Sequence, residues 1–195
     1  MGKIILASGS PRRRELLTQI GAVFEVHKTD GEEIIERTIP SEAVRELAYQ
    51  KTAEAVRRWE GDVIIGADTI VAAGGEILGK PKDREDALRM LALLQGNAHE
   101  VITGVAVYLR EKRTYIRFEE TTKVRVFPMT RAQMECYVDS GEPMDKAGAY
   151  GIQGKFAAYV SGIEGDYNNV VGLPVGRLYQ ELLAEGIDLL ALSGS

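Results

Sequence analysis

The segment KIILASGSPRRRELL, residues 3–17, decides the fold class of this chain of 195 residues. It begins with a short apolar run, Lys3 to Ala7, that predicts a buried strand. In the polar turn that follows, Ser10 suits the N-cap of a helix and Pro11 its first position, and the helix is expected to run to about Ile20. A strand that leads directly into a helix is typical of an α/β protein.

Beyond this segment the sequence alternates between strand and helix patterns. Further strands are predicted at 23–27, 62–69, 100–109, 114–127 and 155–161, with a hairpin at 70–78. Helices are predicted at 41–59, 83–96, 130–140 and 174–186, and loops at 29–40, 141–154 and 162–172. Because the two longest strands are expected to be antiparallel, we predict a mixed α/β sheet with flanking helices. We expect a single domain, residues 1–195, of two lobes around a central cleft, with no boundary readable from the sequence.

Composition narrows the class of protein and its partners. The chain has 29 acidic and 24 basic residues and a net charge of -5, which argues against broad nucleic-acid binding because that needs a basic surface. No stretch approaches the roughly 18 continuous apolar residues of a membrane helix, and the N-terminal apolar run is too short for a signal peptide. The single cysteine, Cys136, excludes an internal disulfide and a cysteine-based zinc site. We therefore expect a cytoplasmic protein that binds neither nucleic acid nor membrane.

Three cations stand where a helix disfavours them. Arg12, Arg13 and Arg14 occupy the first turn of the predicted helix, at the positive end of its dipole. The free N–H groups of that turn attract anions, so a bound anion would turn the repulsion into attraction. The alternative is a solvated basic turn whose charges are screened.

Two further charged residues interrupt apolar patterns. Lys51 lies on the apolar face of its predicted helix, where it either extends to solvent or points into an internal cavity. Asp68, followed by Thr69, ends the apolar strand 62–69, and strand ends in α/β sheets are favoured ligand positions. A carboxylate there can bind a metal or take a proton from water, and an ordinary turn aspartate is the alternative.

Two loops carry further candidates. Pro81 restricts Lys80 to an extended backbone, from which its amine can project toward the same site. The glycine-rich loop 146–154 permits close backbone approach to a ligand, and the amide of its Gln153 can pair with a planar base edge. Solvated turns and a flexible loop are the alternative interpretations. The acidic loop residues that can hold a metal are Glu32, Glu33 and Asp166.

The chain lacks a P-loop, a dinucleotide-binding fingerprint and a nucleophile elbow, but five of its segments together resemble the motifs of one family. In order and spacing they are similar to the motifs of the Maf family of nucleoside triphosphate pyrophosphatases. The segments are 8–17, 66–69, 78–81, 146–154 and 165–174. The resemblance covers nearly the whole chain, up to about Ile187.

The resemblance implies an α/β fold of the inosine-triphosphatase type and cleavage of a nucleoside triphosphate to the monophosphate and pyrophosphate. It also implies a divalent cation, Mg²⁺ or Mn²⁺, as cofactor, and a homodimer. Asp68 matches the family's catalytic proton acceptor. Glu32 or Glu33 matches an acidic position of the family, and we expect Asp68 or Glu33 to help hold the metal. The base-selectivity positions, which resemble the branch that prefers dTTP and UTP, map onto Arg12, Thr69 and Gln153. The phosphate-binding positions map onto Ser8, Arg13, Lys51 and Lys80.

From these assignments we expect water to attack the α-phosphorus and pyrophosphate to leave toward the lysines. Asp68 serves there as base, as metal ligand or as both. The alternatives are a nucleotide sensor without turnover and an enzyme of the same class that acts on ITP or XTP. A nucleic-acid-binding module is the weakest alternative, given the acidic balance. The family is also linked to inhibition of septum formation. Modified pyrimidine triphosphates would fit a house-cleaning role as well as dTTP does.

Overall fold

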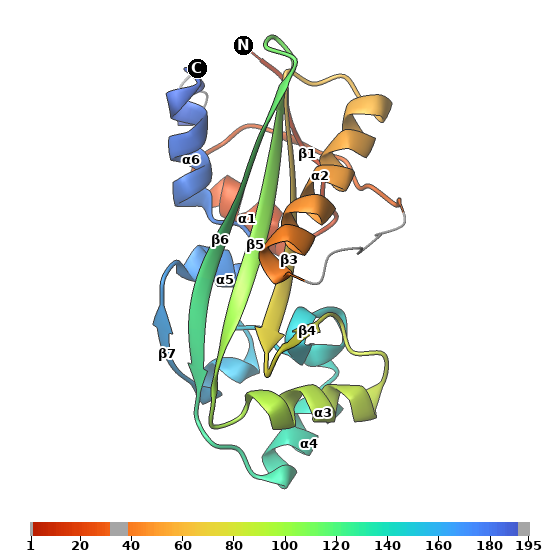
Figure 1. Ribbon diagram of the computed structural model, residues 1–195, viewed down its shortest axis with the longest axis vertical. Helices are drawn as coiled ribbons and strands as arrows, with labels where there is room; N and C mark the ends of the chain where they lie inside the picture. The colour runs from red at the N-terminus through yellow and green to blue at the C-terminus, as the bar shows by residue number, and fades with distance from the viewer. Residues whose placement is uncertain (1, 32–38, 191–195) are drawn as a thin grey trace. The chain divides into compact units, whose positions relative to one another are not determined.

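The computed structural model describes residues 2–31 and 39–190, which form a mixed α/β protein (Figure 1). The strands are β1 Ile4–Leu6, β2 Glu25–Val26, β3 Val63–Ala73, β4 Glu76–Leu78, β5 Ala98–Leu109, β6 Thr114–Val126 and β7 Val160–Glu164. The α-helices are α1 Pro11–Gln19, α2 Pro40–Arg58, α3 Arg84–Leu94, α4 Arg131–Asp139, α5 Tyr167–Val171 and α6 Val175–Ala184. Three short 3-10 helices are η1 Glu142–Asp145, η2 Ala147–Ala149 and η3 Lys155–Tyr159. Among the described residues, no helix combines the length and the apolarity that crossing a membrane requires.

The strands in the described part of the chain form one sheet in the order β2-β1-β3-β5-β6-β7, with β4 paired to β3. β1 pairs in parallel with β2 and β3, whereas β3–β4 and β6–β7 are antiparallel pairs. The predicted mixed sheet with flanking helices is confirmed. The chain divides into two compact units, the first made of residues 1–68, 103–120 and 172–195 and the second of residues 69–102 and 121–171.

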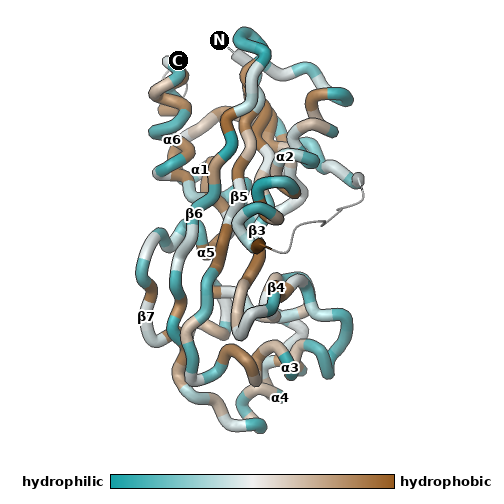
Figure 2. Tube along the Cα trace, viewed as in Figure 1, coloured by the Kyte–Doolittle hydropathy of each residue, from teal (hydrophilic) through white to brown (hydrophobic). Residues whose placement is uncertain are grey.

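The first unit has its core where α2 covers the sheet. Figure 2 shows hydrophobic residues along β1 and β3, and β1 is buried over its whole length. The side of α2 that is buried carries the apolar residues of the helix, namely Ala43, Val44, Leu47, Ala48 and Ala55. The predicted amphipathic helix therefore lays its apolar face on the sheet, which is the main source of its stability.

The second unit has a core of its own beneath α3 and α4. Both helices begin as predicted: the Asp83 side chain caps α3, and Thr130 and Gln133 form a capping box at the start of α4. Their buried side chains include Leu88 and Leu91 of α3 and, on α4, Met134, Tyr137 and Val138. The turns after α4 cover this core through η1, η2 and η3.

Two predictions for the end of this unit are wrong. Residues 155–161 are not a strand, because η3 occupies most of them and β7 begins only at Val160. The Phe156 side chain is fully buried against the rings of Tyr137 and Tyr150, and a helical turn carries it there. Residues 162–172 are not a loop, because β7 pairs with β6 and α5 follows.

Candidate active site

Lys51 of α2 and Asp68 of β3 form an ion pair in the first unit, between the lysine Nζ and the aspartate Oδ1. Their side chains are only 18% and 13% exposed. Charged groups with so little access to water stabilise each other, because removing one of them leaves the other charge uncompensated. Of the two orientations predicted for Lys51, the structure shows the inward one.

Two glycines let α2 lie directly on the sheet. A methyl group at Gly66 of β3 would be 3.0 Å from the Ala48 carbonyl oxygen, and one at Gly104 of β5 would be 2.9 Å from the Arg45 nitrogen. Both atoms belong to the helix backbone, which cannot give way locally. Any side chain larger than glycine at these positions would therefore push α2 away from the strands.

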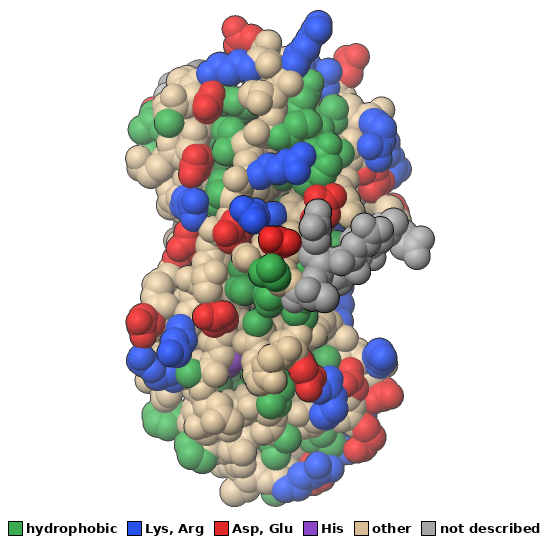
Figure 3. All heavy atoms as spheres, viewed as in Figure 1, with side chains coloured by type: hydrophobic (Ala, Val, Ile, Leu, Met, Phe, Trp, Pro, Cys, Tyr) green, Lys and Arg blue, Asp and Glu red, His purple; other side chains and the backbone are tan. Residues whose placement is uncertain are grey.

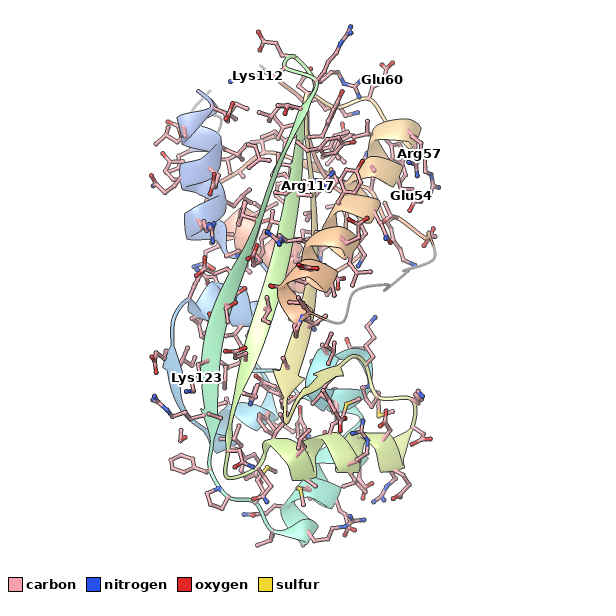
Figure 4. The ribbon with its side chains drawn as sticks, viewed as in Figure 1. Glu54, Arg57, Glu60, Lys112, Arg117 and Lys123 are labelled. Atoms are coloured by element: carbon pink, nitrogen blue, oxygen red, sulfur yellow. The ribbon has the colours of Figure 1, made fainter. Side chains whose placement is uncertain are left out.

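The helix is also tied to the sheet by two of its side chains. Thr52, which is fully buried, donates from Oγ1 to the Ala106 carbonyl oxygen of β5 at 3.0 Å. One turn away is Tyr49, and the guanidinium of Arg117, a β6 residue labelled in Figure 4, stacks over its ring 3.4 Å from the centroid. Lys51 lies between Tyr49 and Thr52 in the chain, so these contacts fix the backbone from which its amine reaches Asp68.

The sequence analysis placed Asp68 and Thr69 at the end of a strand, and this prediction is wrong. Both residues lie inside β3. β3 continues past them, and residues 71–73 pair antiparallel with residues 76–78 of β4. Residues two apart in a strand share one face, so Asp68 projects on the same side as Gly66. That side is the one on which α2 lies, which explains why the aspartate meets a lysine of the helix.

The turn between β1 and α1 is braced by a buried arginine. Arg13 is 9% exposed and donates from Nε to the Gly172 carbonyl oxygen at 2.8 Å and from Nη1 to Ser8 Oγ at 3.2 Å. Ser8 Oγ also accepts the Ser10 N–H at 3.2 Å. Two of the predicted phosphate-binding residues, Ser8 and Arg13, are thus brought together within the turn.

This turn lies near Asp68 in the sheet. β1 runs parallel to β3 with Leu6 opposite Ile65, and the Ala7 N–H donates to the Ile65 carbonyl oxygen at 2.8 Å. The chain therefore leaves β1 for α1 within a few residues of the level of Asp68. This is the carboxyl end of a parallel strand, where ligands of α/β sheets commonly bind.

The start of α1 keeps its positive character. Pro11 opens the helix, the Ser10 side chain makes no capping bond, and the first turn contains no acidic residue. Arg12 is half-buried there, whereas Arg14 is exposed. Backbone N–H groups at a helix N-terminus attract anions, and a neighbouring arginine adds a full charge to that attraction.

The second unit carries the remaining candidates. Thr69 is half-buried in β3, whereas Lys80 after β4 and Gln153 between η2 and η3 are exposed. The loops of Lys80 and Gln153 are joined through the backbone, because the Gly148 N–H donates to the Gly79 carbonyl oxygen at 3.0 Å. The glycine-rich loop thus contacts the backbone of the protein itself at Gly79, and its approach to a ligand stays a prediction.

The acidic residues predicted to hold a metal lie partly within the described part of the chain. Glu32 and Glu33 lie outside the described residues, so that prediction stays a prediction. Within residues 2–31 and 39–190, no three histidine, cysteine or acidic side chains gather into a metal-binding group. Asp166 directly precedes α5, and its Oδ1 accepts the Asn168 N–H at 2.8 Å. Of the two expected metal ligands, Glu33 and Asp68, the structure describes the position of Asp68.

The sequence analysis missed the residues that place the ion pair. Thr52 and Gly104 were not singled out, although each breaks a local pattern. Gly104 interrupts a run of β-branched and apolar residues at 101–107, and Thr52 lies on the apolar face of its helix. A glycine inside a strand and a hydroxyl on a buried helix face both indicate close backbone contact.

Among solved structures, the similarities are distant. A dITP/XTP pyrophosphatase from Mycobacterium abscessus aligns with a TM-score of 0.45 and 15% identity, over 94% of this chain and 98% of that one. The Ham1 protein of Staphylococcus aureus aligns with a TM-score of 0.46 and 16% identity, over 64% of this chain and 71% of that one.

Sequence relatives are much closer. Over 97% of this chain and 100% of its own length, a dTTP/UTP pyrophosphatase of Agathobacter rectalis is 51% identical. A protein of the same name from Lachnoclostridium phytofermentans is 49% identical over 97% of this chain and 98% of its own. The family described as Maf-like protein matches residues 3–185. The chain therefore belongs to the Maf family.

Proposed function

We propose that the chain hydrolyses dTTP and UTP to the monophosphate and pyrophosphate, with water attacking the α-phosphorus. The observation that carries the chemistry is the Lys51–Asp68 ion pair, because it holds a carboxylate in a fixed place on the sheet. The choice of nucleotide is supported by relatives of that name, which are about half identical over nearly their full length.

The charges of the triphosphate must be neutralised before a nucleophile can approach. Arg12 is suited to this, since it lies in the first turn of α1, at a positive helix end that contains no acidic residue. We assign Ser8 and Arg13 to the same phosphates, and Lys51 and Lys80 to the charge that develops on the leaving pyrophosphate. Figure 3 shows acidic and basic side chains interspersed on the face in view, so the proposed attraction is local.

Asp68 is assigned to the attacking water. Lys51 holds Oδ1, so Oδ2 is the oxygen that orients the water and accepts its proton. Proton transfer to a positioned group contributes about 10²- to 10⁴-fold in rate. The rigid seating of β3 against α2 supplies the positioning, which is the larger share of what the protein provides.

The donor set fits a divalent metal that is held mainly by the substrate. Mg²⁺ prefers oxygen ligands and is usually held by one or two carboxylates together with phosphates and water. Asp68 supplies one such carboxylate, and Glu33 is the second that we propose. Mg²⁺ or Mn²⁺ bound there would lower the pKa of water and offset phosphate charge.

Base selection is assigned to Arg12, Thr69 and Gln153. Gln153 has an amide that both donates and accepts hydrogen bonds, as the edge of a uracil or thymine ring requires. A site that hydrogen-bonds one base rejects another that leaves its groups unpaired. Cytosine presents the opposite pattern at the position where uracil and thymine carry a carbonyl, so CTP should be the poorer substrate.

A nucleotide panel tests the proposal. Release of pyrophosphate and monophosphate is measured with Mg²⁺ or Mn²⁺ for UTP, dTTP, CTP, ITP and XTP. We expect UTP and dTTP to have the highest kcat/KM. A preference for ITP and XTP contradicts the pyrimidine assignment, and binding of all nucleotides without pyrophosphate release contradicts an enzyme altogether.

A further inference from the structure

The loop 146–154 is held on both sides of Gln153 by one polar network of the second unit. Two residues before Gln153, the Gly151 N–H donates to Tyr137 Oη at 3.3 Å. Two residues after it, the Lys155 N–H donates to Glu142 Oε2 at 3.0 Å. The network closes because the Tyr137 hydroxyl donates to Glu142 Oε1 at 3.1 Å.

The directions of these bonds require a carboxylate at position 142. Burial, together with the nearby Glu142 carboxylate, raises the pKa of Tyr137, so its hydroxyl keeps its proton and donates. The other donor, the backbone N–H of Lys155, can only donate a hydrogen bond. Glu142 therefore accepts with both of its oxygens, whereas a glutamine would turn an NH₂ group toward one of the two donors.

Packing allows the carboxylate to touch the loop backbone. A methyl group at Gly154 would lie 2.7 Å from Glu142 Oε2, so the carboxylate occupies the space of a missing side chain. Lys146 fixes the backbone of Glu142, because its Nζ donates to the Glu142 carbonyl oxygen at 2.6 Å. The same lysine side chain lies against Gly151, where a methyl group would be 2.7 Å from its Cε. The two glycines beside Gln153 thus have contact partners within the network.

We propose that Glu142, together with Tyr137, is a specificity-positioning residue that fixes Gln153 for reading the base. The inference rests on the proposed function, since it assumes that Gln153 contacts the nucleotide. Gln153 itself is exposed, so its orientation depends on its backbone and not on surrounding side chains. A loop released at these two points loses the alignment on which base discrimination depends, while Asp68, Lys51 and the chemistry assigned to them belong to the other unit.

The test compares Glu142→Gln, which keeps size and removes one acceptor, with Tyr137→Phe, which keeps the ring and removes the hydroxyl. Glu135→Gln is the matched control, because Glu135 forms an ion pair with the exposed Arg131 and lies on the same helix as Tyr137. The readouts are kcat for UTP and the ratio of kcat/KM for UTP to that for CTP. Thermal unfolding of each variant verifies that it is folded.

We expect both variants to lower the UTP-to-CTP ratio about tenfold, the effect of one charge-assisted hydrogen bond. The kcat for UTP should fall no more than about threefold, and Glu135→Gln should change neither quantity. In a Gln153→Ala background, Glu142→Gln should lower the ratio no further, because its effect is made through Gln153.

Four results would overturn the inference, and they separate it from the proposed function. Equal losses for UTP and CTP would mean that the network only stabilises the fold. A further drop of the ratio in the Gln153→Ala background would mean that Glu142 acts independently of that residue. An unchanged ratio in Gln153→Ala alone removes the base-reading assignment and the network's role with it, whereas an unchanged ratio only in Glu142→Gln and Tyr137→Phe removes the network's role alone.

Discussion

The ion pair of the first unit and the Gln153 loop of the second are held in place by different physics. Lys51 and Asp68 lie on a long helix and a long strand that pack backbone to backbone across Gly66 and Gly104. Gln153 lies on a loop of turns, exposed, and its backbone is held by a few hydrogen bonds to side chains. Regular elements give a reacting group the more exact placement, whereas loops are easier to vary. The comparison predicts that damage to the first region lowers rate for every nucleotide and damage to the second alters the choice among them.

The largest effect should come from Asp68→Asn. The variant keeps the shape of the side chain but loses the base, so kcat should fall by about 10²- to 10⁴-fold for UTP and CTP alike. The matched control is Asp139→Asn, which breaks the exposed ion pair with Arg84 and should leave kcat unchanged. Steady-state pyrophosphate release checks both variants. A kcat near that of the unaltered protein would remove Asp68 from the reaction.

Gly104→Ala should have the next largest effect, through the position of α2. The added methyl group meets the helix backbone, so we expect a loss of about 1–3 kcal/mol in the free energy of unfolding. Displacement of Lys51 should also lower kcat by up to about 10²-fold for both nucleotides. Urea unfolding and pyrophosphate release measure the two effects.

The control for this variant is Gly176→Ala, because a methyl group at Gly176 of α6 has nothing within 4 Å. Alanine is the better helix former, so the control should gain about 0.5–1 kcal/mol. Gly104→Ala with the stability and kcat of the unaltered protein would mean that α2 is not held as closely as described.

Gln153→Ala should change selectivity more than rate. With the amide gone, the ratio of kcat/KM for UTP to that for CTP should fall about tenfold, while kcat for UTP stays within a few-fold. The same ratio of kcat/KM for UTP to that for CTP is measured in Asp68→Asn, where it should stay unchanged. Equal losses for both nucleotides would contradict the division between the two regions.

The last effect leaves rate and selectivity unchanged and concerns the pH dependence of stability in the second unit. His99 is buried, with Nε2 2.7 Å from Tyr150 Oη, and burial lowers its pKa to about 4. In the unfolded chain the imidazole binds a proton near pH 6.5, so between pH 6.5 and 4 the unfolded state holds more protons. Stability should therefore fall as the pH drops through this window, by at most about 1.4 kcal/mol per pH unit from this group. Urea unfolding at several pH values should show a shallower dependence for His99→Gln, and an equal dependence would contradict the assignment.

The sequence predicted the start of a helix correctly where a short motif of neighbouring residues determines it. Pro11 at the start of α1 and the capping box of Thr130 and Gln133 on α4 are cases in which a few neighbouring residues suffice. The run around Phe156 was predicted wrongly, because a short apolar segment fits a strand and a buried turn equally well. The choice between strand and turn depends on the contacts of Phe156 with Tyr137 and Tyr150, which do not follow from the local sequence.

The candidate site was predictable in its residues more than in its geometry. The charges of Lys51 and Asp68 stand out against apolar patterns, and both were identified. Whether the lysine points inward depends on what lies beneath α2, and that is set by Gly104 and Thr52 on elements whose pairing the sequence does not reveal. The network of Glu142 and Tyr137 was missed for a similar reason, because it joins a helix, a turn and a loop by bonds to backbone groups.

We expect the Asp68 region to direct water to the α-phosphorus, whichever base the loop accepts. Hydrolysis in heavy-oxygen water, followed by mass spectrometry of the products, tests it most directly. The account predicts the label in the monophosphate for UTP and CTP, in the unaltered protein and in Gln153→Ala. Label in the pyrophosphate, or release of labelled inorganic phosphate, would contradict it.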